Sequence, residues 1–174
     1  MKKIIVILVI LLLPVSYTLA AETGGGLMQI YSPVFKHNEY IPAKYTCEGR
    51  NINPELDIAN LPEGTKTLAL IVDDPDAPIG TWVHWVVFDI PVSNNIIKEN
   101  SVPGVLGITN SGKKDYHGPC PPSGTHRYFF KVYALDTILN LKEGVSKGQL
   151  EASMQGHILA KAELIGLYKR GSNR

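Results

Sequence analysis

Two long apolar runs, Thr67–Asp73 and Val83–Ile90, constrain the fold of this chain more than any other feature. Each run is rich in β-branched or aromatic residues and nearly uninterrupted, as expected of a strand that is covered on both faces. The intervening DPDAPIGT cannot continue a strand, because Pro75 and Pro78 lack the ladder N–H and Gly80 permits a turn. The two runs therefore predict central strands of a sheet.

Shorter segments of the same character are bounded by Pro, Gly and Asn. They predict further strands at Met28–Ser32, Leu56–Ile58 and His126–Leu135. The alternation of strands and helices that builds parallel sheets is missing from the chain. Many short strands followed by one late helix favour a mainly β fold, a β-sandwich with a C-terminal helix.

The helix is predicted over Lys147–Ala162, with Ser146 as its N-cap. Its apolar stripe consists of residues spaced four apart, namely Leu150, Met154, Ile158 and Ala162. The following run, Glu163–Tyr168, alternates loosely and is expected to return to the sheet.

The N-terminus has the pattern of a secretory signal peptide. Lys2 and Lys3 form a basic start, Ile4–Leu13 is apolar, Pro14 interrupts the run, and Thr18–Ala21 offers small residues for cleavage. The apolar run is shorter than the roughly 20 residues that span a bilayer, so cleavage is favoured over an uncleaved anchor. The mature protein is therefore expected in the periplasm or outside the cell.

Residues 1–20 are thus predicted to be a signal peptide, residues 21–26 a flexible leader and residues 27–170 a single domain. The whole chain has 174 residues, with 17 basic and 16 acidic side chains. Removal of Lys2 and Lys3 leaves 15 basic residues and a formal charge of −1. This balance gives no electrostatic basis for binding nucleic acid or a membrane surface.

The chain has two cysteines, Cys47 and Cys120. In an oxidising compartment, two cysteines without a third favour one disulfide. Buried free thiols are the alternative, and a zinc site is less favoured because no second thiol neighbours either cysteine.

Three polar clusters adjoin the ends of the predicted strands. In chain order they are Asp73, Asp74 and Asp76; Trp82 and His84; and His117, Gly118, His126 and Tyr128. Histidine and tyrosine donate hydrogen bonds, glycine exposes its backbone N–H, and a nearby aspartate favours a protonated histidine. Such a set suits an oxyanion, with the histidines as charged donors. Each cluster also has a local explanation, as an Asx-type turn or as a satisfied core histidine.

The segments DDPDAPIGTWVHW and GPCPPSGTHRYFFKVYALD resemble the phosphatidylethanolamine-binding protein family, and within it the bacterial Raf-kinase-inhibitor-like branch. The resemblance runs from FKHNEYIPAKYTCEGRNINPEL to the C-terminal helix, and it implies an antiparallel β-sandwich with a small anion-binding pocket at one end. Residues that match the family's ligand-binding motifs are Asp74, Asp76, Trp82, His84, Gly118, His126 and Tyr128. Eukaryotic members usually carry a histidine where this chain has Val83, so the resemblance does not extend to their protein partners.

Together these features favour a secreted, non-catalytic protein that binds a small anionic ligand or phospholipid head group without a cofactor or metal. Two alternatives are a regulator that acts through a protein surface, such as a kinase or protease inhibitor, and a metal site of two histidines and an aspartate. A third is a hydrolase built from Asp74, His84 and His126 with Ser111 or Ser123. The sequence names no protein partner, leaves a homodimer open, and implies neither a nucleic-acid partner nor a transmembrane segment after signal removal.

Overall fold

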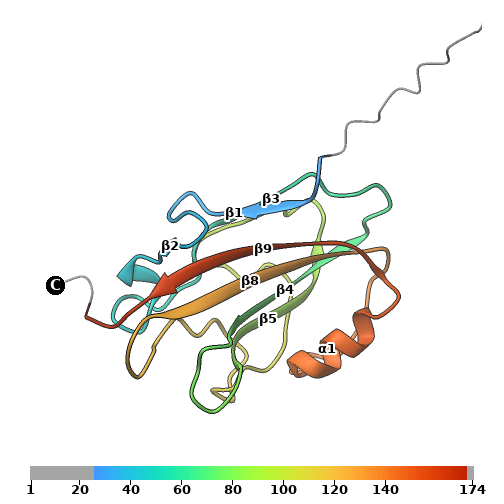
Figure 1. Cartoon of the computed structure of the whole chain (residues 1–174). Coiled ribbons are helices and arrows are strands. Elements are labelled where there is room, and N and C mark those ends of the chain that lie inside the picture. Colours follow the sequence, from blue (N-terminus) through green and yellow to red (C-terminus); the bar gives the residue numbers. More distant parts are fainter. Residues whose placement is uncertain (1–25, 172–174) are drawn as a thin grey trace, which may run out of the picture.

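The computed structural model describes residues 26–171, which form two packed β-sheets and one short helix (Figure 1). The predicted signal peptide and nearly all of the predicted leader lie outside the described residues. The strands are β1 (Gln29–Tyr31), β2 (Glu39–Tyr40), β3 (Leu56–Ala59), β4 (Thr67–Asp74), β5 (Trp82–Pro91), β6 (Ile96–Ile97), β7 (Val105–Leu106), β8 (His126–Leu135) and β9 (Ile158–Tyr168). The helix α1 spans Lys147–Met154, and a 3₁₀ turn spans Ala43–Tyr45.

The larger sheet has the strand order β2-β9-β8-β4-β5-β7, and the smaller has the order β1-β3-β6. All neighbouring strands are antiparallel except the two-residue pair of β2 with β9. The predicted β-sandwich with a C-terminal helix is confirmed. The two apolar runs are adjacent strands, β4 and β5, and β4 is buried at all eight positions.

Two apolar cores explain why β4 and β5 lack the usual alternation of apolar and polar residues. Inward side chains such as Leu70 and Val87 pack between the sheets, whereas outward ones such as Ile71 and Phe88 pack in a second core with Leu150 of α1. Both faces of these strands are therefore covered, which removes apolar area from water on each side.

The predicted helix over Lys147–Ala162 is wrong beyond Met154. Its start is as expected, with Ser146 and Gln149 forming a reciprocal capping box. The helix ends because Gly156 adopts φ +80°, a left-handed conformation typical of the residue after a helix C-cap. Ile158 to Tyr168 then pairs along the whole of β8, so backbone pairing with a long strand prevails over the four-residue spacing.

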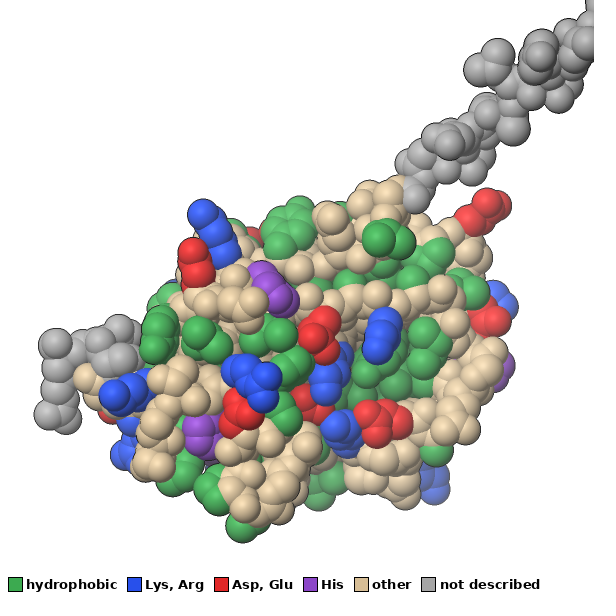
Figure 2. Space-filling view, viewed as in Figure 1, with side chains coloured by type: hydrophobic (Ala, Val, Ile, Leu, Met, Phe, Trp, Pro, Cys, Tyr) green, Lys and Arg blue, Asp and Glu red, His purple; other side chains and the backbone are tan. Residues whose placement is uncertain are grey.

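The surface shows no large area of one charge in the view of Figure 2. Acidic and basic side chains are interspersed on the face that β8 and β9 contribute. Within residues 26–171, no helix is long and apolar enough to cross a membrane.

Asp73, at the end of β4, has an outward side chain that joins α1 to the sheet. Its carboxylate is fully buried and accepts hydrogen bonds from Lys131 Nζ at 2.8 Å and Lys147 Nζ at 2.5 Å. Lys131 comes from β8 and Lys147 from the first turn of α1. The second core, which includes Ile71, Phe88 and Leu150 and is called the outer core below, is thus closed at one end by an ion-pair network rather than by apolar packing.

We expect Asp73→Asn to lower the free energy of unfolding by about 3 kcal/mol, because it leaves two lysines without their shared anion. Urea unfolding would measure this loss. The matched control is Glu151→Gln, since the Glu151 side chain is 44% exposed and lies 3.8 Å from Lys147; it should change stability by less than about 0.5 kcal/mol. Equal effects of the two substitutions would contradict the assigned role of Asp73.

Candidate functional site

Asp74, the last residue of β4, and Asp76 have different roles, although only Pro75 separates them. Asp74 faces inward, where its carboxylate accepts from the Asp76 backbone N–H at 2.8 Å and from His126 Nδ1 at 2.7 Å. Asp76 accepts two bonds from the Arg127 side chain and one from the Arg127 backbone N–H. The bonds from Arg127 lower the pKa of Asp76 to about 2. Asp76 thus fastens the turn to β8, and Asp74 belongs to the site.

A β-bulge in β5 positions His84. Val72 pairs with Trp85 and Asp73 pairs with Val83, so β5 holds His84 as an extra residue opposite β4. A bulge of this kind breaks the alternation of side chains. Trp85 packs in the core between the sheets, while its neighbour His84 also turns inward and contacts the ring of Tyr128 with centroids 5.2 Å apart.

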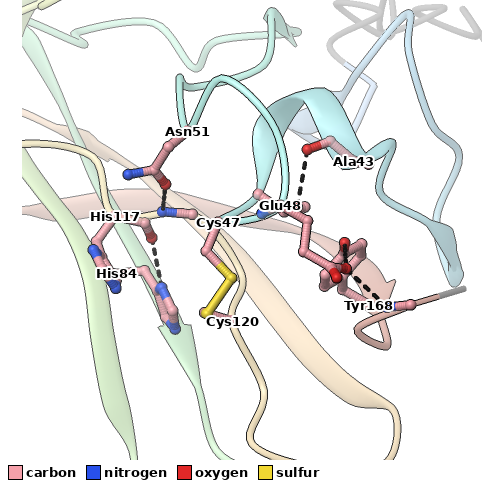
Figure 3. The surroundings of a disulfide bond; sticks show 11 residues. Ala43, Cys47, Glu48, Asn51, His84, His117, Cys120 and Tyr168 are labelled. Carbon is pink, nitrogen blue, oxygen red and sulfur yellow. Dashed lines mark hydrogen bonds between the residues drawn. A yellow bond between two sulfur atoms is a disulfide. The ribbon is translucent and has the colours of Figure 1, made fainter. Parts of the chain in front are cut away.

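His84 and His117 hold each other by reciprocal hydrogen bonds, one of which is drawn in Figure 3. The His117 backbone N–H donates to the His84 carbonyl at 2.9 Å, and His84 Nδ1 donates to the His117 carbonyl at 2.5 Å. Because His84 is the bulged residue, the bulge sets the point at which the loop that carries His117 contacts the sheet. Burial lowers the pKa of His84 from 6.5 to about 4, so the ring is neutral near pH 7. This differs from the charged donor that the sequence analysis expects at this position.

Among the side-chain N and O atoms of residues 26–171 that are completely shielded from solvent, only Tyr128 Oη has no hydrogen-bond partner. The side chain is fully buried, and burial together with the Asp74 carboxylate raises the pKa of Tyr128, so the hydroxyl remains a donor. A buried hydroxyl without a partner is costly and requires an explanation. The ring of Tyr128 lies beside that of His84, and the Asp74 carboxylate that bonds His126 is also close to it.

These side chains meet at a cavity of about 370 Å³. Its polar lining is Asp74, His84, His117, His126 and Tyr128, and its apolar lining is Ala77, Pro78, Ile79, Trp82, Pro121 and Pro122, with Cys120 between them. The structure thus brings together five of the seven residues that the resemblance implies, and Asp76 and Gly118 do not line the cavity. The sequence places His117 in the loop before β8, but its hydrogen bonds with His84 depend on the bulge and have no local sequence signal.

Gly118 packs the loop closely rather than exposing its N–H to a ligand. That N–H donates to Asn51 Oδ1 at 2.7 Å (Figure 3), and a Cβ at residue 118 would lie 2.5 Å from the Tyr45 carbonyl oxygen. No larger residue fits without displacing the segment around Tyr45, so glycine is required here by contact distance.

The predicted disulfide between Cys47 and Cys120 is confirmed, with Cα atoms 5.4 Å apart. Figure 3 shows how it holds the segment around Cys47 against the loop that carries His117. A backbone bond from Cys47 N–H to the Pro119 carbonyl adds to this connection. The covalent bond therefore forms part of the cavity wall, through Cys120.

Neither serine considered for a hydrolase lines the cavity. Ser111 Oγ lies 2.8 Å from Thr109 Oγ1, in the turn that precedes the loop. No group of three or more His, Cys, Asp or Glu side chains within residues 26–171 is arranged to hold a metal ion.

Comparison with known proteins gives consistent matches. The family model described as phosphatidylethanolamine-binding protein matches residues 31–169. A UPF0098 protein of Aquifex aeolicus is 50% identical over 158 residues, covering 86% of this chain and 92% of that protein. One from Methanothermobacter thermautotrophicus is 49% identical over 152 residues, covering 83% of this chain and 100% of that protein.

Two solved structures are similar over most of the chain. The phosphatidylethanolamine-binding protein homolog CT736 of Chlamydia trachomatis has a TM-score of 0.81 and 41% identity, covering 83% of this chain and 98% of that chain. Escherichia coli YbcL, described as a member of the mammalian PEBP family, has a TM-score of 0.77 and 30% identity, covering 83% of this chain and 99% of that chain.

The low pKa of His84 predicts acid sensitivity. An unfolded histidine titrates at about pH 6.5, so the unfolded state binds more protons than the folded state between pH 6.5 and 4. The contribution of neutral His84 to the free energy of unfolding is therefore complete above pH 6.5. This free energy falls by up to about 3 kcal/mol as the pH is lowered to 4.

Urea unfolding at pH 7 and pH 4.5 would measure the loss. In His84→Asn the loss between the two pH values should be smaller by about 2–3 kcal/mol. His157→Asn is the control, because this histidine side chain is 47% exposed, and it should leave most of the loss in place. A pH dependence that is unchanged in His84→Asn would refute the prediction.

Proposed function

The chain belongs to the phosphatidylethanolamine-binding protein family, and we propose that it binds a small anionic group, phosphate-like or carboxylate-like, in the cavity beside Tyr128. The observation that carries the proposal is the buried Tyr128 hydroxyl, which has no partner within residues 26–171. An anionic oxygen in the cavity would accept this bond and remove the cost of the unsatisfied donor.

The pair of Asp74 and His126 supports an anionic ligand. Asp74 accepts from His126 Nδ1 and so fixes the orientation of the imidazole ring, whose side chain is only 9% exposed. When His126 is protonated, its Nε2 becomes a second donor and Asp74 balances the added charge. The cavity would then hold two donors that are positioned before the ligand arrives, which reduces the entropy cost of binding.

The apolar wall suggests that the anionic group carries an apolar substituent. Trp82, Pro121 and Ile79 are among the residues that form this wall, and Ile79 is 84% exposed at the mouth. Pockets of this size typically combine an apolar lining with a few directed polar groups. A monoester or a carboxylate with an apolar chain would use both parts of the cavity.

We also propose that the protein does not turn its ligand over. The proposal rests on the positions of the candidate nucleophiles, since neither Ser111 nor Ser123 lies at the cavity. The rings of His84 and His126 are held at Nδ1 by the His117 carbonyl and by Asp74, and neither serine lies at the cavity beside them.

Calorimetric titration of the mature protein with phosphate and with acetate should give millimolar or tighter binding and a rise in melting temperature by mass action. Tyr128→Phe should weaken binding about tenfold, the effect of losing one hydrogen bond to a charged group. Tyr133→Phe, on the same strand but in the outer core, is the matched control and should bind normally. The absence of heat and thermal shift with both anions would refute the proposal, and release of product from a phosphomonoester would refute the non-catalytic part.

We further propose that the mature protein acts in the periplasm or outside the cell. The support is the N-terminal pattern of Lys2, Lys3 and Ile4–Leu13, together with the Cys47–Cys120 disulfide, since such bonds persist in oxidising compartments. Fractionation of the producing cells and intact mass measurement should find a shortened chain without free thiols outside the cytoplasm. Reduction should cost the protein about 4 kcal/mol of stability. A full-length cytoplasmic chain with two alkylated thiols would contradict the proposal.

A further inference from the structure

The charge of the cavity is unusual for an anion site. None of the twelve residues that line it is Lys or Arg, and Asp74 is the only carboxylate among them. A dianion would therefore lie close to Asp74 without a fixed cation to balance it. Recognition in this cavity must depend on directed hydrogen bonds more than on net charge.

The hydrogen bonds of His84 fix its tautomer. Its Nδ1 lies 2.5 Å from the His117 carbonyl oxygen, which can only accept, so Nδ1 carries the proton. In a neutral ring, Nε2 then has a free lone pair and acts as an acceptor. The structure gives His84 Nε2 no hydrogen-bond partner within residues 26–171, and the side chain lines the cavity.

The surroundings of His84 keep the ring neutral. The side chain is 3% exposed, and burial disfavours its charged form more than the His117 carbonyl, Asp74 and Asp73 favour it. The remaining titratable groups at the cavity are His117, stacked at 5.8 Å between ring centroids, Tyr128 at 5.2 Å, and His126, which is bonded to Asp74. A donor, Tyr128 Oη, and an acceptor, His84 Nε2, thus belong to two rings that line the same cavity with centroids 5.2 Å apart.

Resting on the proposed function, we propose that the site selects an oxyanion that carries its own proton, such as a singly protonated phosphomonoester or phosphonate. The ligand's P–OH donates to His84 Nε2, while one of its unprotonated oxygens accepts from Tyr128 Oη. The two rings lie edge to face with centroids 5.2 Å apart and both line the cavity, so we place the tetrahedral head group against both of them. Single protonation also reduces the charge that Asp74 faces.

This arrangement discriminates against anions of the same shape that lack a proton. A sulfonate has the geometry and the single charge of a protonated phosphonate, but each of its oxygens can only accept. One of them would face the lone pair of His84 Nε2 with no hydrogen between. A site built to bond a ligand hydroxyl rejects the analogue without it, and we expect a difference of at least about tenfold in affinity.

The test compares methylphosphonate with methanesulfonate by calorimetric titration of the mature protein at about pH 5.5. A phosphoryl group has a second pKa near 6 and is then mainly singly protonated, while His84, with a pKa of about 4, is still mainly neutral. Methylphosphonate should bind at least about tenfold more tightly. If both anions bind alike, or the sulfonate binds better, the inference is overturned and the proposed function stands. If neither binds, the inference fails, and the titrations with phosphate and acetate decide the proposed function.

Two substitutions separate the acceptor from the donor. In His84→Asn, the side-chain amide can still donate to the His117 carbonyl from a position close to Nδ1, but nothing replaces Nε2. The preference for methylphosphonate should fall below about threefold. Tyr128→Phe removes the donor that both anions use, so both affinities should fall and the preference should persist. A full preference in folded His84→Asn would overturn the inference.

A measurement on the wild-type protein covers the case in which His84→Asn does not fold. In ¹⁵N NMR spectra at about pH 5.5, His84 Nε2 should retain the signal of an unprotonated nitrogen when methylphosphonate binds. A directly attached proton on Nε2 in this complex would show that His84 donates to the ligand, which would overturn the inference.

Discussion

The β-bulge at His84 is the constraint on which the rest of the site depends. One extra residue in β5 turns His84 toward the cavity beside Tyr128 while Trp85 remains in the core. The bulged residue is unpaired in the ladder, and its carbonyl is instead bonded by the His117 backbone N–H. The loop that follows is then held by the Gly118–Asn51 bond and by the disulfide at Cys120, so that two of its prolines form a cavity wall. Each of these contacts depends on the position that the bulge gives to the end of β5 around His84.

The end of β4 shows how strand geometry divides one acidic segment into separate functions. Asp73 points outward to two lysines and connects α1 to the sheet, whereas Asp74 points inward and orients His126. Asp76 lies past the strand and fastens the turn to β8 through Arg127. Stability and the site are thus coupled at this strand end, because the neighbouring residues Asp73 and Asp74 close the outer core and line the inner cavity, respectively.

The cavity differs from a site that binds anions by fixed positive charge. Its lining contains no Lys or Arg, and its polar side chains are enclosed by proline, alanine, isoleucine and tryptophan. In such an environment a hydrogen bond that is not made costs more than it would in water, so selectivity comes from matching donors to acceptors. The relatives described as phosphatidylethanolamine-binding proteins share the fold around this cavity, and in this chain the tautomer of His84 depends on a single carbonyl from a loop.

The sequence by itself predicted the class of fold, the two central strands, the disulfide and four of the five polar residues that line the cavity, because apolar runs, paired cysteines and motif spacing are local or compositional signals. Gly156, which ends α1, is also visible in the sequence, but the four-residue spacing of Leu150 to Ala162 predicts a helix that continues past it. The same apolar residues are compatible with a strand paired with β8, which is what the structure contains. Only the tertiary structure decided that His84 is a neutral acceptor, that His117 belongs to the cavity, and that Asp76 and Gly118 serve the scaffold. These properties depend on which groups from distant segments surround each side chain, on burial and on a bulge that shifts the register, and none of them is encoded in the spacing of residues along the chain.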